Sequence, residues 1–223
     1  MSGWANSKRE FKYVTDKDNT NKAISYSAKI LKSPITQINS NIIIDYNEIL
    51  QGGCIYLPKF FCDKNDFMIF ESLKKELDMS HVINWSKHHK FENPQISKTF
   101  NNIIDAMAMH FNVKIIQTRL NYYKDYTSYK PLHKDSHSYY TDENGNTLKE
   151  NFTMGASFGF TRELEFMHEE SKTKFSFPQN NGDIFAFNSQ INDKFLHGVP
   201  KIQKNPHKHI SDRISIIAWG IKN

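Results

Sequence analysis

The sequence has few of the residues that build membrane spans, secretion signals or disulfide frameworks. No apolar run approaches the roughly 20 residues that cross a bilayer, so we expect no membrane partner. The first nine residues, MSGWANSKR, contain no apolar stretch, and we therefore expect no secretory signal. Only two cysteines occur, Cys54 and Cys62, which excludes a disulfide framework and a zinc site built from cysteines. We expect both to be reduced thiols in an intracellular protein of the cytoplasm or nucleus.

The residues that are present indicate a folded domain. Aromatic residues make up 13% of the 223 residues and apolar residues 38%, which excludes wholesale disorder. A chain of this length can bury one domain core and still leave residues for an extension. The first 48 residues are polar with few apolar anchors, and no internal repeat is visible. The sequence therefore predicts a partly irregular N-terminal extension over 1–48 and one domain over 49–223, with a monomer as the default.

Charge and histidine content suggest partners without fixing them. Basic residues outnumber acidic ones by 29 to 24, a net charge of +5, which favours a polyanion such as nucleic acid. The same balance is typical of a soluble protein rich in lysine and asparagine, so both interpretations stay open. Ten histidines are a more informative signal, because imidazole is the commonest metal ligand in proteins.

Two amphipathic helices are predicted early in the domain. A short strand over 54–58 ends at a proline, and Asp63 is positioned to cap a helix over 64–78. Apolar residues recur there at three- and four-residue steps, and again over 96–111, which predicts a second helix. Between the helices, residues 86–90 are polar and carry two histidines, which predicts a loop.

The rest of the chain is predicted to be almost entirely β-structure. Candidate strands, rich in β-branched and aromatic residues, cover 113–123, 152–160, 162–168, 173–177, 182–187 and 213–219. Turn residues separate them, most clearly over 142–146 and 178–182. Two helices followed by many short strands predict an α+β fold in which the helices buttress an antiparallel sandwich or barrel.

The pair His133 and Asp135 is the first candidate for chemistry. Residues two apart on a strand point to the same face, so this imidazole and this carboxylate would be aimed at one point. They make two thirds of the 2-His-1-carboxylate triad of non-haem iron oxygenases. Composition alone predicts about one such pair by chance, and a second one occurs at His168 and Glu170. That second pair lies on a strand with the pattern of a solvated sheet edge.

The surroundings distinguish the first pair from the second. One face of the strand 113–123 carries a row of residues that is unusually polar for a core and indicates a polar pocket inside a barrel. These residues are Ile115, Gln117, Arg119, Asn121 and Tyr123.

His197 is our candidate for the remaining histidine ligand. It follows the apolar strand 182–187, and Gly198 beside it permits a close approach of another backbone. Its competitors, His207 and His209, lie in a basic segment predicted to be an exposed loop.

Arg213 is a candidate anion-binding residue. It opens a strongly apolar strand, so its guanidinium must find an anion or reach water. Taken alone, it could instead form an internal salt bridge to Asp183 or Asp212.

Taken in order, these motifs resemble the AlkB-like branch of the Fe(II)/2-oxoglutarate dioxygenases. The series is Asn-x-Tyr, His-x-Asp, Gly-Asp-Ile-Phe-Ala-Phe, His-Gly-Val-Pro and Arg-Ile-Ser on a last strand. The resemblance covers about residues 52–221 and is most specific over 121–219. It implies a double-stranded β-helix, or jelly roll, buttressed by the two helices.

The resemblance also implies cofactors and roles. His133, Asp135 and His197 would bind Fe(II) and form the catalytic centre, with O2 as oxidant. 2-Oxoglutarate would bind the iron, with its far carboxylate on Arg213. The residues expected to help bind it are Tyr123 and Ser215, by hydrogen bonds, and Asn121, by orienting it. Its decarboxylation to succinate would drive hydroxylation of a C–H bond. Hydroxylation of a methyl group on nitrogen would release formaldehyde.

One position departs from the AlkB-like pattern, and the substrate is left with alternatives. These proteins usually carry a second arginine six residues after the first, where this chain has Trp219, which weakens the assignment to nucleic-acid demethylation. The insert 136–150 is also long. The residues expected at the substrate are Trp85 and His88, in a lid over 79–99, with Lys134 and Trp219.

We expect a methylated or otherwise modified base in DNA or RNA as the substrate, and a role in repair. The first alternative is a protein or small-molecule hydroxylase on the same scaffold. The second is a jelly-roll binding module without enzymatic activity.

Overall fold

A computed structural model describes residues 53–79, 83–85, 88–92, 94, 96–170, 172, 174–202 and 212–222, with the strand backbone alone for 83–85 and 88–92. The predicted extension 1–48 lies outside this part of the chain, as do His207 and His209. Among the described residues, no helix is both long and apolar enough to cross a membrane. Cys54 and Cys62 are both buried, and neither forms a disulfide bond within the described residues.

Short strands make up most of the described chain. The helices are α3 (Met68–Glu76), α4 (Lys98–Phe111) and α5 (Ser189–Lys194). The strands are β1 (Cys54–Leu57), β2 (Ile83–Trp85), β3 (His88–Glu92), β4 (Val113–Tyr123), β5 (Lys130–His133), β6 (Tyr139–Thr141), β7 (Thr147–Lys149), β8 (Phe152–Gly159), β9 (Arg162–His168), β10 (Lys174–Gln179), β11 (Ile184–Asn188), β12 (Phe195–Val199) and β13 (Arg213–Lys222).

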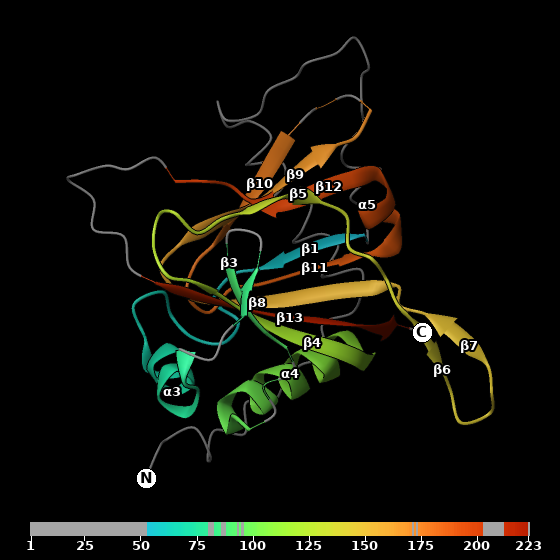
Figure 1. Cartoon of the computed structure of the whole chain (residues 1–223), viewed down its shortest axis with the longest axis horizontal. Coiled ribbons are helices and arrows are strands. Elements are labelled where there is room, and N and C mark those ends of the chain that lie inside the picture. Colours follow the sequence, from blue (N-terminus) through green and yellow to red (C-terminus); the bar gives the residue numbers. More distant parts are fainter. Residues whose placement is uncertain are drawn as a thin grey trace.

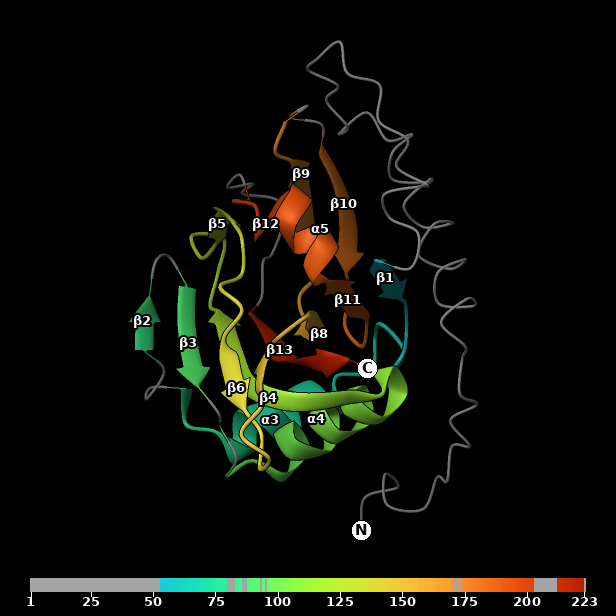
Figure 2. The ribbon, with the colours of Figure 1, turned by 90° about the vertical axis from the view of Figure 1, so that its right-hand side faces the viewer.

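The elements form three layers (Figures 1 and 2). A seven-stranded sheet has the order β1-β11-β8-β13-β4-β3-β2, and a four-stranded sheet has the order β10-β9-β12-β5. All the strand pairs are antiparallel. Helices α3 and α4 cover the face of the larger sheet that is turned away from the smaller one. This is the predicted jelly roll buttressed by two helices.

Two apolar clusters hold the layers together. The first joins the buried faces of α3 and α4, including Phe70, Leu73 and Phe100, to the larger sheet. The second is mostly phenylalanine and fills the space between the sheets, with Phe166 and Phe187 among its members. Burying one such side chain stabilises the fold by about 1.5–3 kcal/mol.

The helices match the periodicity, with one correction at a helix start. Helix α4 begins after Ser97, whose hydroxyl accepts a hydrogen bond from the Phe100 N–H. Helix α3 begins four residues later than predicted, and Asp63 does not cap it. The reason is tertiary, because the Asn181 amide donates to the carbonyl oxygens of Asp63 and Asp66 and holds this segment as a turn.

Strand β4 has the predicted bounds, but its inward face is shorter than predicted. Its pairing with β13 shifts register between Trp219 and Gly220, which leaves Ile116 as the extra residue of a bulge. Ile115 consequently packs against the apolar cluster under the helices, whereas Arg119, Asn121 and Tyr123 of the predicted row line a pocket between the sheets. Gln117 does not line this pocket, and its amide donates hydrogen bonds to Ser138 and Glu150.

Two other predictions are wrong, those of a loop over 86–90 and of a sheet edge at 162–168. Strand pairing, which the local sequence pattern does not reveal, decides both. Of the segment predicted as a loop over 86–90, residues 88–90 belong to β3, which pairs with β2 on one side and with β4 on the other. Residues 86 and 87 lie outside the described part of the chain. Strand β9 is not a sheet edge, because it lies between β10 and β12. The insert 136–150 forms the separate β6–β7 hairpin, with the predicted turn at Asp142.

Candidate functional site

A pocket with an empty volume of about 550 Å³ opens between the two sheets. It is lined mainly from β4 and β13 of the larger sheet and from β5 and β12 of the smaller one. The lining residues are Arg119, Asn121, Tyr123, Lys130, His133, Asp135, Thr153, Leu164, Phe185, His197, Gly198, Val199, Arg213, Ser215, Ile217 and Trp219.

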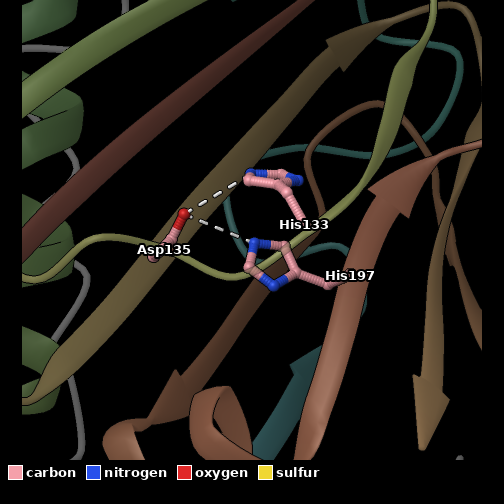
Figure 3. A group of neighbouring side chains, drawn as sticks. All are labelled: His133, Asp135 and His197. Atoms are coloured by element: carbon pink, nitrogen blue, oxygen red, sulfur yellow. Dashed lines mark ion pairs between the residues drawn. The ribbon is translucent and has the colours of Figure 1, made fainter. Parts of the chain in front are cut away.

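His133, Asp135 and His197 converge in this pocket, as predicted (Figure 3). The two histidines are direct partners in the β5–β12 register, so their rings lie on one face with centroids 4.5 Å apart. The Oδ1 atom of Asp135 lies 3.6 Å from Nε2 of His133 and 3.4 Å from Nε2 of His197.

The spacing of these atoms suits a single metal ion. The three ligand atoms all lie within 4.8 Å of one another. Two ligands at right angles around an ion, each about 2.1 Å from it, lie about 3 Å apart. The two distances to Asp135 Oδ1 are only slightly longer. Two imidazoles and one carboxylate are the donor set of non-haem Fe(II) sites with open positions. Among the described residues, no other such cluster occurs.

The protonation of His133 fits the role of a ligand. Its Nδ1 lies 3.0 Å from the carbonyl oxygen of Pro131. This contact places the proton on Nδ1, since a carbonyl can only accept. The lone pair of Nε2 is then directed at the point shared with Asp135, the arrangement that orients most metal-binding histidines.

Asp135 is held by a tertiary contact that the sequence did not suggest. Strand β5 ends at His133, so the two residues are not two positions apart on one strand as predicted. The Asn192 side chain instead accepts a hydrogen bond from the Asp135 N–H at 2.9 Å and donates to its carbonyl oxygen at 3.0 Å. Asn192 is buried in the short helix α5, and no motif marks it.

The second oxygen of Asp135 is occupied by two hydrogen bonds. Trp219 Nε1 donates to Oδ2 at 2.9 Å and Thr153 Oγ1 at 3.1 Å. Burial alone would raise the pKa of Asp135. Electrostatic interactions with His197 and polar contacts with His133 and Trp219 outweigh burial and hold this pKa well below its usual range. Asp135 is therefore ionised, as a metal ligand must be.

His197 is buried among aromatic rings and lies against a tightly approaching strand. Burial lowers its pKa, which favours the neutral ring that can bind a cation, while the charge of Asp135 acts in the opposite direction. Gly198 permits the close approach that was predicted, because a Cβ there would lie 2.7 Å from the Lys130 carbonyl oxygen.

Arg213 lies in the same pocket with an unsatisfied hydrogen-bond donor. Its Nε donates to Ser157 Oγ at 2.9 Å, and Nη1 is buried with no hydrogen-bond partner. Among the described residues, no carboxylate pairs with it. Asp212 binds Lys74 and Tyr122 instead, and Asp183 binds Tyr56.

Burial makes the charge of Arg213 costly. It lowers the pKa of Arg213 to about 10. A buried guanidinium with one idle donor is costly unless an anion pairs with it. The pocket therefore contains a cation that could pair with a carboxylate, beside three side chains that could hold a metal ion.

Three predicted neighbours of Arg213 lie in the same pocket. Tyr123 is the register partner of Arg213 and forms a hydrogen bond with it, and Asn121 is the register partner of Ser215. Burial raises the pKa of Tyr123, while the charges of the two arginines beside it act in the opposite direction. The second of these is Arg162, which no sequence argument identified and which lies 5.5 Å from the Tyr123 ring.

The residues expected at the substrate are not all in the pocket. Trp219 lines it, whereas the Lys134 ammonium binds Glu169 and the Asp193 carbonyl oxygen. The side chains of Trp85 and His88 lie outside the described part of the chain. Two cations also line the pocket: Arg119, which was predicted on the polar face of β4, and Lys130.

No protein-family model matches this chain, and no curated protein matches it. Solved structures do. A Pseudomonas putida prolyl-4-hydroxylase aligns with a TM-score of 0.54 at 10% identity, covering 77% of this chain and 93% of its own. A 2OG-Fe(II) oxygenase family oxidoreductase from Burkholderia pseudomallei aligns with a TM-score of 0.53 at 14% identity, covering 79% and 87%. OsALKBH1 aligns with a TM-score of 0.48 at 14% identity, covering 74% and 97%. On the first two alignments, the chain has the jelly-roll fold of the 2-oxoglutarate/Fe(II) oxygenases.

Proposed function

We propose that this protein is an Fe(II)- and 2-oxoglutarate-dependent dioxygenase. The observation that carries the proposal is that one pocket contains both a 2-His-1-carboxylate group and a buried arginine with an idle donor. The first fits a ferrous ion, and the second fits the far carboxylate of a dicarboxylic acid. Neither feature alone specifies the reaction, but their combination matches the two cofactors that the sequence resemblance implies.

Each residue has a task that follows from its contacts. His133, Asp135 and His197 would hold the iron. Arg213 would bind the carboxylate of 2-oxoglutarate, and Tyr123 beside it would add a hydrogen bond. Asn121 and Ser215, also in the pocket, would orient the co-substrate. The bound iron and 2-oxoglutarate together would supply O2 activation for hydroxylation of a C–H bond.

Turnover of 2-oxoglutarate tests this proposal. We expect the purified protein to convert 2-oxoglutarate to succinate only when Fe(II) and O2 are both present. His133→Ala and Arg213→Met should each abolish or strongly reduce succinate formation. Wild-type protein that binds neither Mn(II) nor 2-oxoglutarate would contradict the proposal and would favour a binding module without activity.

For the substrate we propose a methylated or otherwise modified base in nucleic acid. The pocket supports an anionic substrate. Three basic residues, Arg119, Lys130 and Arg213, line it. The chain's net charge of +5 also suits a polyanion.

The second candidate is hydroxylation of a protein, and one observation favours it. Trp219 occupies the position where AlkB-like proteins usually carry a second arginine, and one solved structure with this fold is a prolyl-4-hydroxylase. Product analysis separates the two candidates: formaldehyde from methylated oligonucleotides, or a hydroxylated residue in a peptide. Nucleic-acid binding should also weaken steeply as salt is raised, because phosphate neutralisation releases counterions.

A further inference from the structure

Trp219 makes a specific contact at the candidate metal centre. The side chain is only 7% exposed, and its indole N–H donates to Asp135 Oδ2. The residue that departs from the AlkB-like pattern is therefore joined directly to a proposed ligand. A packing role would need the ring alone, whereas this contact uses its single polar atom.

A second donor reaches the same oxygen from the neighbouring strand. Thr153 on β8 is the register partner of Trp219 on β13, and its hydroxyl also donates to Asp135 Oδ2. The other oxygen, Oδ1, faces Nε2 of both histidines. Two hydrogen bonds withdraw electron density from Oδ2 and fix the plane of the carboxylate. Oδ1 is then the better ligand and the one pointed at the ion.

The indole is itself held in place. The Arg119 guanidinium lies 5.1 Å from the Trp219 ring, a cation–π contact that restrains the plane of the indole. Asn192 fixes the backbone of Asp135 by its two hydrogen bonds. Both the carboxylate and the backbone of Asp135 are thus restrained by hydrogen bonds.

We propose that Trp219 is a positioning residue that, together with Thr153, limits Asp135 to metal coordination through one oxygen. The proposal rests on the metal site of the proposed function. An arginine at this position would offer a charged donor to Asp135, whereas the neutral indole leaves the carboxylate its full negative charge for the ion. The restriction to one oxygen also keeps a coordination position open for a co-substrate or substrate.

Cobalt(II) is a suitable probe, because its visible absorption reports the number and geometry of its ligands. The test variants are Trp219→Phe, which keeps an aromatic ring and removes the donor, and Thr153→Val. The matched control is Tyr56→Phe, which removes a donor to the buried carboxylate of Asp183, outside the pocket. Circular dichroism and thermal melting check that each variant is folded.

We expect Trp219→Phe to bind Co(II) about 10- to 100-fold more weakly than wild type, the usual effect of losing a contact that orients a ligand. Its Co(II) absorption should change shape as the freed oxygen joins the ion. Thr153→Val should produce a smaller change in the same direction and serves as the test if Trp219→Phe does not fold. Tyr56→Phe should change melting temperature without changing affinity or spectrum.

The outcomes separate this proposal from the one on which it rests. Unchanged affinity and spectrum in Trp219→Phe, with Co(II) binding still lost in His133→Ala, would overturn the positioning role and leave the metal site intact. Wild-type protein that binds no Co(II) would overturn both.

Discussion

Two buried aspartates show how this protein separates structure from chemistry. Asp183 is only 1% exposed, and both of its oxygens accept hydrogen bonds, from Tyr56, the Lys59 N–H and Asn180. Asp135 has only Oδ2 occupied by hydrogen bonds, while Oδ1 faces two imidazole nitrogens. The saturated carboxylate ties a turn between β10 and β11 to β1. The partly satisfied one is available to a ligand.

The two buried arginines repeat this contrast. Arg162 donates through Nη2 to the carbonyl oxygens of Ser128 and Pro200, and thereby joins two loops. Arg213 has Nη1 buried with no partner. An unsatisfied buried polar group costs about 1–3 kcal/mol, so a fold retains one where a ligand will complete it. The idle Nη1 therefore distinguishes Arg213 from Arg162 as the arginine to which a ligand could bind.

Loss of a metal ligand should have the largest effect. His197→Ala should abolish the metal-induced rise in melting temperature and the turnover of 2-oxoglutarate. At a metal concentration 100-fold above the dissociation constant, wild-type protein should gain about 2.7 kcal/mol. Thermal melts with and without Mn(II) measure this. Asp183→Asn should lower the melting temperature but keep the full response to metal, and an equal loss of response in both variants would invalidate the contrast.

Removal of Arg213, the residue proposed to bind the far carboxylate of 2-oxoglutarate, should have the second largest effect. Arg213→Met should weaken 2-oxoglutarate binding by about 2–5 kcal/mol, the usual effect of truncating one partner of a buried charge pair. Calorimetric titration with Mn(II) present measures it. The protein without ligand should be no less stable, because a buried unpaired charge is removed. Arg162→Met should instead lower stability, and a 2-oxoglutarate defect of similar size in both variants would contradict the distinction.

Two buried asparagines allow a smaller test of the same contrast. Asn192→Ala should reduce stability by about 1–3 kcal/mol, because it leaves the Asp135 backbone unpaired, and should weaken metal binding about tenfold. Asn181→Ala removes contacts to the Asp63–Asp66 turn and to the Gly159 N–H. It should destabilise the protein with little change in metal affinity. Denaturant unfolding and Co(II) titration together decide the comparison.

The smallest effect concerns two lysines near the metal centre. Lys130 lines the pocket, whereas the Lys134 ammonium is paired with Glu169. If the substrate is single-stranded nucleic acid, Lys130→Ala should weaken binding and reduce the slope of log affinity against log salt by about 0.7. Lys134→Ala should change neither quantity measurably, because Glu169 already pairs with the Lys134 ammonium. Equal effects of the two substitutions would contradict a specific role of the pocket in binding the substrate.

Local patterning determined much of this protein. Apolar spacing predicted α3 and α4, because an amphipathic face can be identified within one segment. A run of β-branched and aromatic residues predicted the long strand β4. The ordered motifs resemble a known family, and that resemblance predicted the convergence of His133, Asp135 and His197. Arg213 was predicted to need an anion or water because it opens a strongly apolar strand. The jelly roll followed from the resemblance that these motifs carry.

Tertiary structure decided the strand pairing and the side-chain contacts that join residues distant in sequence. Pairing with β4 made β3 a strand where a loop was predicted, and a bulge at Ile116 moved Ile115 out of the pocket face. The contact of Trp219 with Asp135 spans 84 positions in the chain, and that of Asn192 with Asp135 spans 57. Periodicity reports only which face a residue occupies within its own element. Which donors reach a given carboxylate oxygen is fixed when the sheets pack together.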